Sequence, residues 1–415
     1  MLQDLKFKGS RFCGLSDRRF KMLVKFPKVL MIELLAILLV FITPTLASAY
    51  DVNEKLSIEG TLTGVYQHGD FDFEGIDDAD RGAAVLDLGI NFHPTDKDEF
   101  LVTVSFAAGN GLNAVTPFSL APYADDLEDD LKDINGRNRD YLLEAWYKHT
   151  FTFTKDTSLG ITLGIIDATG YIDDNNFAND EVNQFMNDIF VNNTLTNLPS
   201  YDPGGVVEFK ICNFSLRGLM MGSKMEGDPV ATEIGHLKNG TPVFSDVEKY
   251  ESYNYYALQI GYKLDTPMGE GNYRIYGFTT DDEFQNWDGT DKENLQGFGI
   301  SVDQKLSEIF GLFARAGWQD DKTPIDHDTL YSGGLNLNGK LWGRENDEIG
   351  VGYAYLEGAD RGGDIDNTNA VEAYAKFKVT DFSDITFDLQ YVDEKRRQGE
   401  DRDGFIYGIR LNASF

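Results

Sequence analysis

Charged and aromatic side chains recur at alternate positions of several segments that carry an apolar residue at every other position. These positions are Glu144, Trp146, Arg217, Arg274, Arg315, Asp388 and Arg410. Arginine presents several donors in a fixed plane, carboxylates accept hydrogen bonds, and an aromatic ring offers an apolar face. This mixture suits weak binding of hydroxyl-bearing solutes better than bond cleavage.

A second group of polar residues lies in the segment between about residues 169 and 203. Its carboxylate and amide members are Asp173, Asn175, Asp180, Glu181, Gln184 and Asn187. Within it, Val182, Phe185, Met186, Ile189 and Phe190 have helical spacing, so residues 180–190 predict a short amphipathic helix with Asp180 as N-cap. We expect this segment to fold inward and narrow an internal passage; a helix that only caps the outer rim is the alternative.

Catalysis finds little support, because none of the five histidines shares a strand face with a serine. We therefore predict no catalytic residue, no cofactor and no metal. The spacing of apolar residues in 122–134 predicts a second helix, which also carries a run of acidic residues. Such a run usually forms a solvent-exposed face. A bound calcium or a cation bridging to lipopolysaccharide is the alternative, but the ligand order of a calcium loop is absent.

Period-two alternation of apolar and polar residues predicts sixteen strands after residue 49. The connections alternate strictly between long and short: the shortest of eight long connections has ten residues, and the longest of seven short turns has seven. Long loops at one end and tight turns at the other are typical of an antiparallel transmembrane β-barrel, with the loops outside the cell and the turns in the periplasm.

A soluble β-sandwich also shows alternation, but it must bury its apolar faces. Sixteen strands enclose a space too wide for side chains to fill, so we expect the apolar set to face lipid and the polar set to face water. No segment after residue 49 is long and apolar enough to predict a spanning helix.

Residues 1–49 resemble a secretion signal. A basic stretch precedes the apolar run 34–42, and Ala47, Ser48 and Ala49 supply small residues for cleavage, with Met22 a candidate start. An N-terminal anchor is the alternative, although Glu33 interrupts the apolar run. Residues 50–415 would then form a single barrel domain with 29 basic and 66 acidic residues, an excess that disfavours nucleic acid as a partner.

Three blocks of sequence resemble the carbohydrate-selective porin family of bacterial outer membranes. They are Asp173–Phe177 with Asn179–Phe185, Gly299–Leu306 with Gly311–Arg315, and Asp388–Tyr391 with Gly408–Leu411. The resemblance covers roughly residues 140–415. Val392, Asp393 and Glu394 follow Tyr391, where the family pattern tends to continue with Asn-Pro.

The resemblance implies a passive diffusion channel for small sugars in the bacterial outer membrane. A general or organic-acid porin, a barrel hydrolase and a barrel receptor are the alternatives. Expected partners are outer-membrane lipid and lipopolysaccharide, and the barrel-insertion machinery, which would read the terminal aromatic Phe415. Both a homotrimer and a monomer are consistent with the sequence.

Overall fold

The computed structural model describes residues 50–71, 76–125, 127, 141–225, 237–238, 241–242 and 251–414. The predicted secretion signal 1–49 and Phe415 lie outside these residues, as does most of the helix predicted at 122–134. The described residues fall in one compact unit, Ala47–Phe415.

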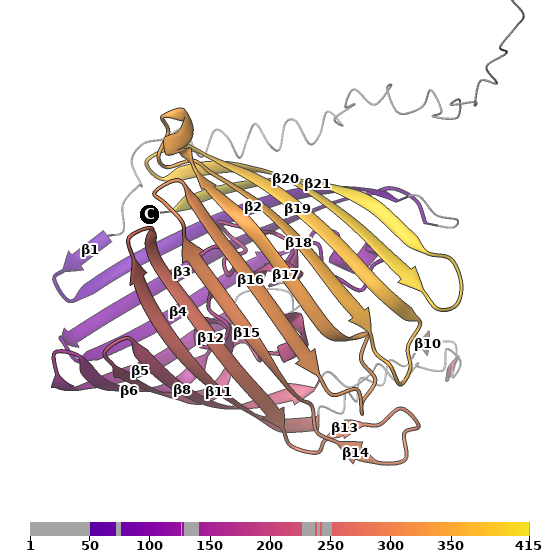
Figure 1. The fold of residues 1–415 in the computed structure, drawn as a ribbon, viewed down its shortest axis with the longest axis horizontal. Coiled ribbons are helices and arrows are strands. Elements are labelled where there is room, and N and C mark those ends of the chain that lie inside the picture. Colours follow the sequence, from indigo (N-terminus) through magenta and orange to yellow (C-terminus); the bar gives the residue numbers. More distant parts are fainter. Residues whose placement is uncertain are drawn as a thin grey trace, which may run out of the picture. The chain divides into compact units, whose positions relative to one another are not determined.

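Sixteen antiparallel strands form a closed barrel in which each strand pairs with its sequence neighbours (Figure 1). Closure joins the first to the last strand, with a register running from Thr61 opposite Ser414 to Phe71 opposite Gly404. The strands are β2 (Leu56–Phe71), β3 (Ala79–Thr95), β4 (Asp98–Ala108), β5 (Tyr141–Thr154), β6 (Thr157–Ile166), β7 (Asp202–Ile211), β8 (Phe214–Met225), β11 (Glu251–Thr266), β12 (Gly269–Thr280), β15 (Gln296–Lys305), β16 (Phe310–Gln319), β17 (His327–Asn338), β18 (Glu348–Gly358), β19 (Ile365–Thr380), β20 (Ser383–Arg396) and β21 (Arg402–Ser414). The predicted fold class and strand number are confirmed.

A short strand, β1 (Tyr50–Asn53), covers the part of β2 that lies beyond the end of β21. Tyr50 pairs with Ile58 and Asn53 with Leu56, whereas pairing with β21 begins at Thr61. The edge of β2 therefore keeps backbone partners at the seam of the barrel, where unpaired N–H and C=O groups would otherwise invite pairing with another chain.

The remaining elements are short and lie in the connections. Two small hairpins pair β9 (Leu237–Lys238) with β10 (Thr241–Pro242) and β13 (Phe284–Gln285) with β14 (Lys292–Glu293). The helices are η1 (Asn113–Val115), η2 (Ala168–Gly170), α3 (Asp188–Val191), η3 (Thr194–Thr196) and η4 (Gly339–Trp342). Among the described residues, no helix has the length and hydropathy needed to cross a membrane.

The two faces of the wall differ as the alternation predicts. Leu258 is 53% exposed and Met220 51% exposed on the outer face, whereas their inward-pointing neighbours Gln259 and Leu219 are buried. Aromatic side chains cluster near both ends of the outer face, with Phe100 against Tyr147 and Phe298 against Trp318. Apolar bands flanked by aromatic residues are the pattern of an outer-membrane barrel.

One strand departs from the predicted phase. Strict alternation along 141–147 predicts Leu143 on the lipid face with Tyr147, but Leu143 is buried inside against Val85, and Leu142 is exposed instead. The cause is an irregularity in the pairing of β4 with β5, where Thr103 faces Glu144 but Val104 faces Leu142. One extra residue on β5 reverses the orientation of every side chain beyond it.

Candidate functional site

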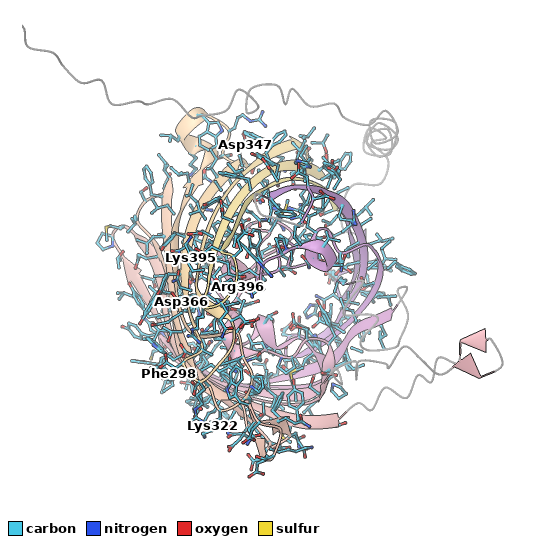
Figure 2. The ribbon with its side chains drawn as sticks, turned by 90° about the vertical axis from the view of Figure 1, so that its right-hand side faces the viewer. Phe298, Lys322, Asp347, Asp366, Lys395 and Arg396 are labelled. Atoms are coloured by element: carbon cyan, nitrogen blue, oxygen red, sulfur yellow. The ribbon has the colours of Figure 1, made fainter. Side chains whose placement is uncertain are left out.

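The connection between β6 and β7, residues 167–201, folds into the barrel and is called the β6–β7 loop below. Figure 2 looks toward the ring of strands and shows short helices of the inner loops within it. The ring centroid of Phe185 lies 5.0 Å from that of Tyr374 and 5.5 Å from that of Phe313, and both of these rings belong to the inner wall. Gly352 provides the space beside them, since a Cβ there would lie 2.7 Å from the ring of Phe190. The apolar residues of the predicted helix thus pack on the wall.

The helix itself is shorter than predicted, because residues 180–184 form a turn and only α3 is helical. Wall side chains take the backbone groups that a longer helix would have paired. The Glu372 carboxylate accepts the N–H groups of Met186, at 2.5 Å, and Asn187, at 3.0 Å. Asn187 then caps α3 by accepting the N–H of Ile189.

Arg315 points inward, as its strand phase predicts, and is completely covered by the β6–β7 loop. Its guanidinium pairs with the buried Asp173 carboxylate at 3.0 Å and donates to the carbonyls of Ala178, Phe190 and Val191. A charge-assisted contact of this kind is strong in a buried setting, but only while all its partners are present. Arg315 therefore fixes the loop and presents no donors to an internal passage.

Arg410 of β21 also binds the backbone of the β6–β7 loop. It donates to the carbonyl oxygens of Glu181, at 2.6 Å, and Gln184, at 2.9 Å, and it is fully buried. Asn412, two residues further along β21, donates to the carbonyl of Val182 at 2.7 Å. One strand thus holds three carbonyls of the turn, those of Glu181, Val182 and Gln184.

Arg274 and Arg217 share one carboxylate. Asp174 lies 2.8 Å from Arg274 and 3.0 Å from Arg217, while Arg274 also pairs with Asp303 and Arg217 with Glu208. Asn175 donates to the Ser301 hydroxyl at 3.2 Å in the same region. The side chain of Arg217 stays 16% exposed, so this network reaches the edge of the loop.

The other three expected wall residues, Glu144, Trp146 and Asp388, also face inward. The Trp146 indole N–H donates to Glu144 at 3.2 Å, and the Trp146 ring packs beside the buried cluster around Ile166. Asp388 accepts from Gln390 at 3.0 Å and is 6% exposed. All seven expected wall residues therefore point into the barrel, although the loops cover several of them.

A second inward-folded segment was not anticipated from the sequence. Residues 109–125 of the connection between β4 and β5, called the β4–β5 loop, lie against the wall glutamines. The carbonyl of Pro122 accepts from Gln67 at 2.7 Å and from Gln390 at 2.9 Å. Ala124 then donates to the carbonyl of Met186, which joins the two loops. The sequence signal for this contact is a pair of inward-pointing glutamines on β2 and β20, the two strands that pair with β21.

The two loops enclose a cavity of ≈ 320 Å³, called the waist cavity. Four carboxylates line it: Asp125, Asp167, Glu181 and Asp188. The other polar groups are amides, among them Asn192, and hydroxyls, and the described residues of the lining include no lysine or arginine. The waist cavity therefore offers many hydrogen-bond acceptors, a smaller number of neutral donors and a negative field.

Burial shifts the ionisation of these carboxylates. Burial, reinforced by the neighbouring carboxylate of Asp180, raises the pKa of Glu181 to about 7. Burial also raises the pKa of Asp167, against hydrogen bonds from Thr169 and Ser200 that favour the charged form. A carboxylic acid that is partly protonated near neutral pH can donate as well as accept.

No group of three or more histidine, cysteine or acidic side chains in the described part of the chain could hold a metal ion.

Comparison with known proteins gives concordant results. The family model described as carbohydrate-selective porin, OprB family, matches residues 86–415. An uncharacterised protein of Aquifex aeolicus is 33% identical over 340 residues, which is 81% of this chain and 90% of that protein.

Two solved structures of Pseudomonas putida OprB share the fold. The structure at high pH has a TM-score of 0.67 at 16% identity, covering 88% of this chain and 95% of that one. The structure at low pH has a TM-score of 0.53 at 14% identity, covering 88% and 94%.

Proposed function

The chain belongs to the carbohydrate-selective porin family, the OprB family, and from this membership we propose that sugars cross its barrel through the waist cavity. The family and the barrel make it a channel of the bacterial outer membrane. Its long loops lie outside the cell and its short turns in the periplasm. The proposal also includes the absence of catalytic activity, a preference among sugars and the roles given to individual residues.

The observation that carries the proposal is the position and chemistry of the waist cavity. It lies between two loops that fold into the barrel, and its lining combines carboxylates, amides and hydroxyls. A sugar hydroxyl both donates and accepts, so a sugar can exchange one set of partners for another as it moves. Binding must stay weak for the solute to leave, which predicts saturable flux with modest affinity.

The expected wall and loop residues then divide into two roles. Arg274, Arg315 and Arg410 position the β6–β7 loop, because they bind its carbonyl oxygens or its Asp173 and Asp174 carboxylates. Glu181 belongs to the lining itself. Flux through the channel should therefore depend on the arginines indirectly, through the shape of the waist cavity, and on the lining residues directly.

Filling the waist cavity tests this route. Thr194 lines the cavity and is partly exposed, so Thr194→Trp should slow the swelling of liposomes in glucose and lower the single-channel conductance. Val379→Trp is the matched control, because Val379 is 64% exposed on the outer face near a periplasmic turn. Unchanged glucose uptake by a folded Thr194→Trp barrel would show that sugars take another path.

A further inference from the structure

The β6–β7 loop covers the inner wall unevenly. On β16, β19 and β21, the inward side chains of Arg315, Glu372 and Arg410 are buried beneath the loop that they bind. On β5, the inward side chains of Trp146 and Lys148 stay partly exposed. Because these two side chains point into the barrel, they are exposed to the lumen. Among the described residues, the interior is therefore open along β5.

The inward side chains of β5 continue from the waist cavity toward the periplasm. Asp167 lines the waist cavity, and its backbone N–H donates to the carboxylate of Glu144. Trp146 and Lys148 follow at alternate positions of the strand, which ends at the short turn of residues 155–156. Inward side chains that follow one another along a strand lie about 7 Å apart. A solute that leaves the waist cavity along β5 therefore meets these three side chains in turn.

Trp146 is held with part of its ring accessible from the lumen. The indole N–H donates to the Glu144 carboxylate at 3.2 Å, which fixes the ring along the strand. The ring packs beside the buried cluster around Ile166, and Tyr171 of the β6–β7 loop packs on the same cluster. The rest of the indole is open to solutes. A fixed aromatic surface of this kind can pack against the C–H groups of a flat sugar ring.

Lys148 supplies hydrogen-bond donors that the loop-binding arginines do not. Arg315 and Arg410 donate to carbonyl groups of the β6–β7 loop. Among the described residues, the ammonium group of Lys148 has no hydrogen-bond or ion-pair partner. Gly160 leaves room for the Lys148 side chain, since a Cβ at Gly160 would lie 3.3 Å from the Lys148 Cε. The three N–H donors of the ammonium group are thus available to a solute.

We propose that Trp146, with Glu144 and Lys148 on either side of it along β5, forms a binding site for one pyranose ring on the periplasmic side of the waist cavity. The inference rests on the proposed function and names its substrate class, which is sugars in ring form rather than open-chain polyols. A pyranose presents C–H groups to the indole and hydroxyls at its edge, whereas an open-chain polyol has hydroxyls but no rigid face. The hydroxyls donate to Glu144, which keeps free acceptor positions, and accept from Lys148.

Block of the ion current through the full-length purified protein in a planar bilayer tests the site. Glucose should block at a lower concentration than sorbitol, an open-chain polyol of nearly the same size. Trp146→Ala should weaken the block by glucose about two- to tenfold and leave the block by sorbitol unchanged. Trp146→Phe should keep part of the preference, because it keeps an aromatic ring. Trp318→Ala is the matched control, since Trp318 stacks on Phe298 on the outer face.

Equal block by glucose and sorbitol would overturn the site, as would a glucose block that a folded Trp146→Ala barrel retains in full. In either case, a saturable block by glucose would still support the proposed function. Failure of the site and failure of the sugar route can therefore be told apart.

Indole fluorescence gives a measurement that does not depend on ion current. Glucose should change the tryptophan emission of the wild-type protein in detergent, and Trp318→Phe should retain this response. Trp146→Phe should lose most of it, because the ring that contacts the sugar is gone. A full response in Trp146→Phe would overturn the site by placing the sugar against another tryptophan.

Lys148→Met tests the donor beside the ring, because methionine keeps an unbranched side chain and removes the ammonium group. The block by glucose should weaken about two- to tenfold. Lys155→Met is the control, since Lys155 is 90% exposed in the turn that follows β5. A glucose block that is the same in both variants would contradict the part given to Lys148.

Discussion

Glu181 shows how a single side chain sets the charge of the passage. Its backbone carbonyl is held by Arg410, so the residue cannot move away from the waist cavity without breaking a 2.6 Å hydrogen bond. Its carboxyl group faces Asp180 and Asp167, which oppose ionisation, and Arg410, which favours it. Burial and the two acidic neighbours prevail, so the charge of Glu181 changes close to neutral pH.

The pH dependence of ion selectivity follows from this balance. Since the pKa of Glu181 is raised to about 7, the carboxyl is neutral below that pH and ionised above it. The cation-over-anion permeability ratio should therefore increase from pH 6 to pH 8, measured as reversal potential. Glu181→Gln should reduce this increase, and an identical pH profile in the variant would contradict the assignment.

At the scale of elements, the β6–β7 loop is held by the barrel wall rather than by its own secondary structure. Its only helices are one turn or less, while Arg315, Arg410, Glu372 and Asn412 bind its backbone groups directly. A segment fixed in this way depends on a few buried polar contacts, each of which is costly to break on one side only.

Arg315→Gln should release the loop from the wall. The substitution leaves the buried Asp173 carboxylate without its cation, and breaking a buried pair on one side costs about 3–5 kcal/mol. We expect a higher and noisier single-channel conductance with weaker sugar selectivity. Arg344→Gln is the matched control, since Arg344 pairs with Asp347 at a periplasmic turn outside the loops. Equal conductance in both variants would argue against the anchoring role.

The elements also show how far sequence reasoning reaches. Alternation places the strands and their outer faces correctly, because every strand of a transmembrane barrel needs apolar side chains on the face that contacts lipid. It fails at Leu143, where one extra residue changes the phase, and at residues 180–184, where Glu372, Arg410 and Asn412 replace helical hydrogen bonds. Those partners are distant in sequence, so local periodicity carries no information about them. The strand phase of Arg315 predicts its direction but not the loop that covers it.

At the scale of the whole barrel, stability rests on the separation of lipid-facing and interior side chains. Leu258 lies near the middle of β11 and points outward, whereas Val379 lies near the periplasmic end of β19. A charge in the middle of the bilayer cannot reach water, but a charge near the interface can.

Arginine substitutions should report this depth directly. Leu258→Arg should destabilise the barrel by about 2–4 kcal/mol, and Val379→Arg by about 0–1 kcal/mol, in urea titrations of protein folded into lipid vesicles. Equal effects at the two sites would mean that the outer face does not meet lipid as described.

The most direct test of the account is the single-channel current of the purified barrel in a planar bilayer, with and without sugar. The account predicts discrete conducting steps that sugar interrupts in a concentration-dependent, saturable way, and it predicts that Thr194→Trp reduces both the conductance and the interruptions. An absence of steps, or steps that sugar at millimolar concentration leaves unchanged, would contradict passage of sugars through the waist cavity.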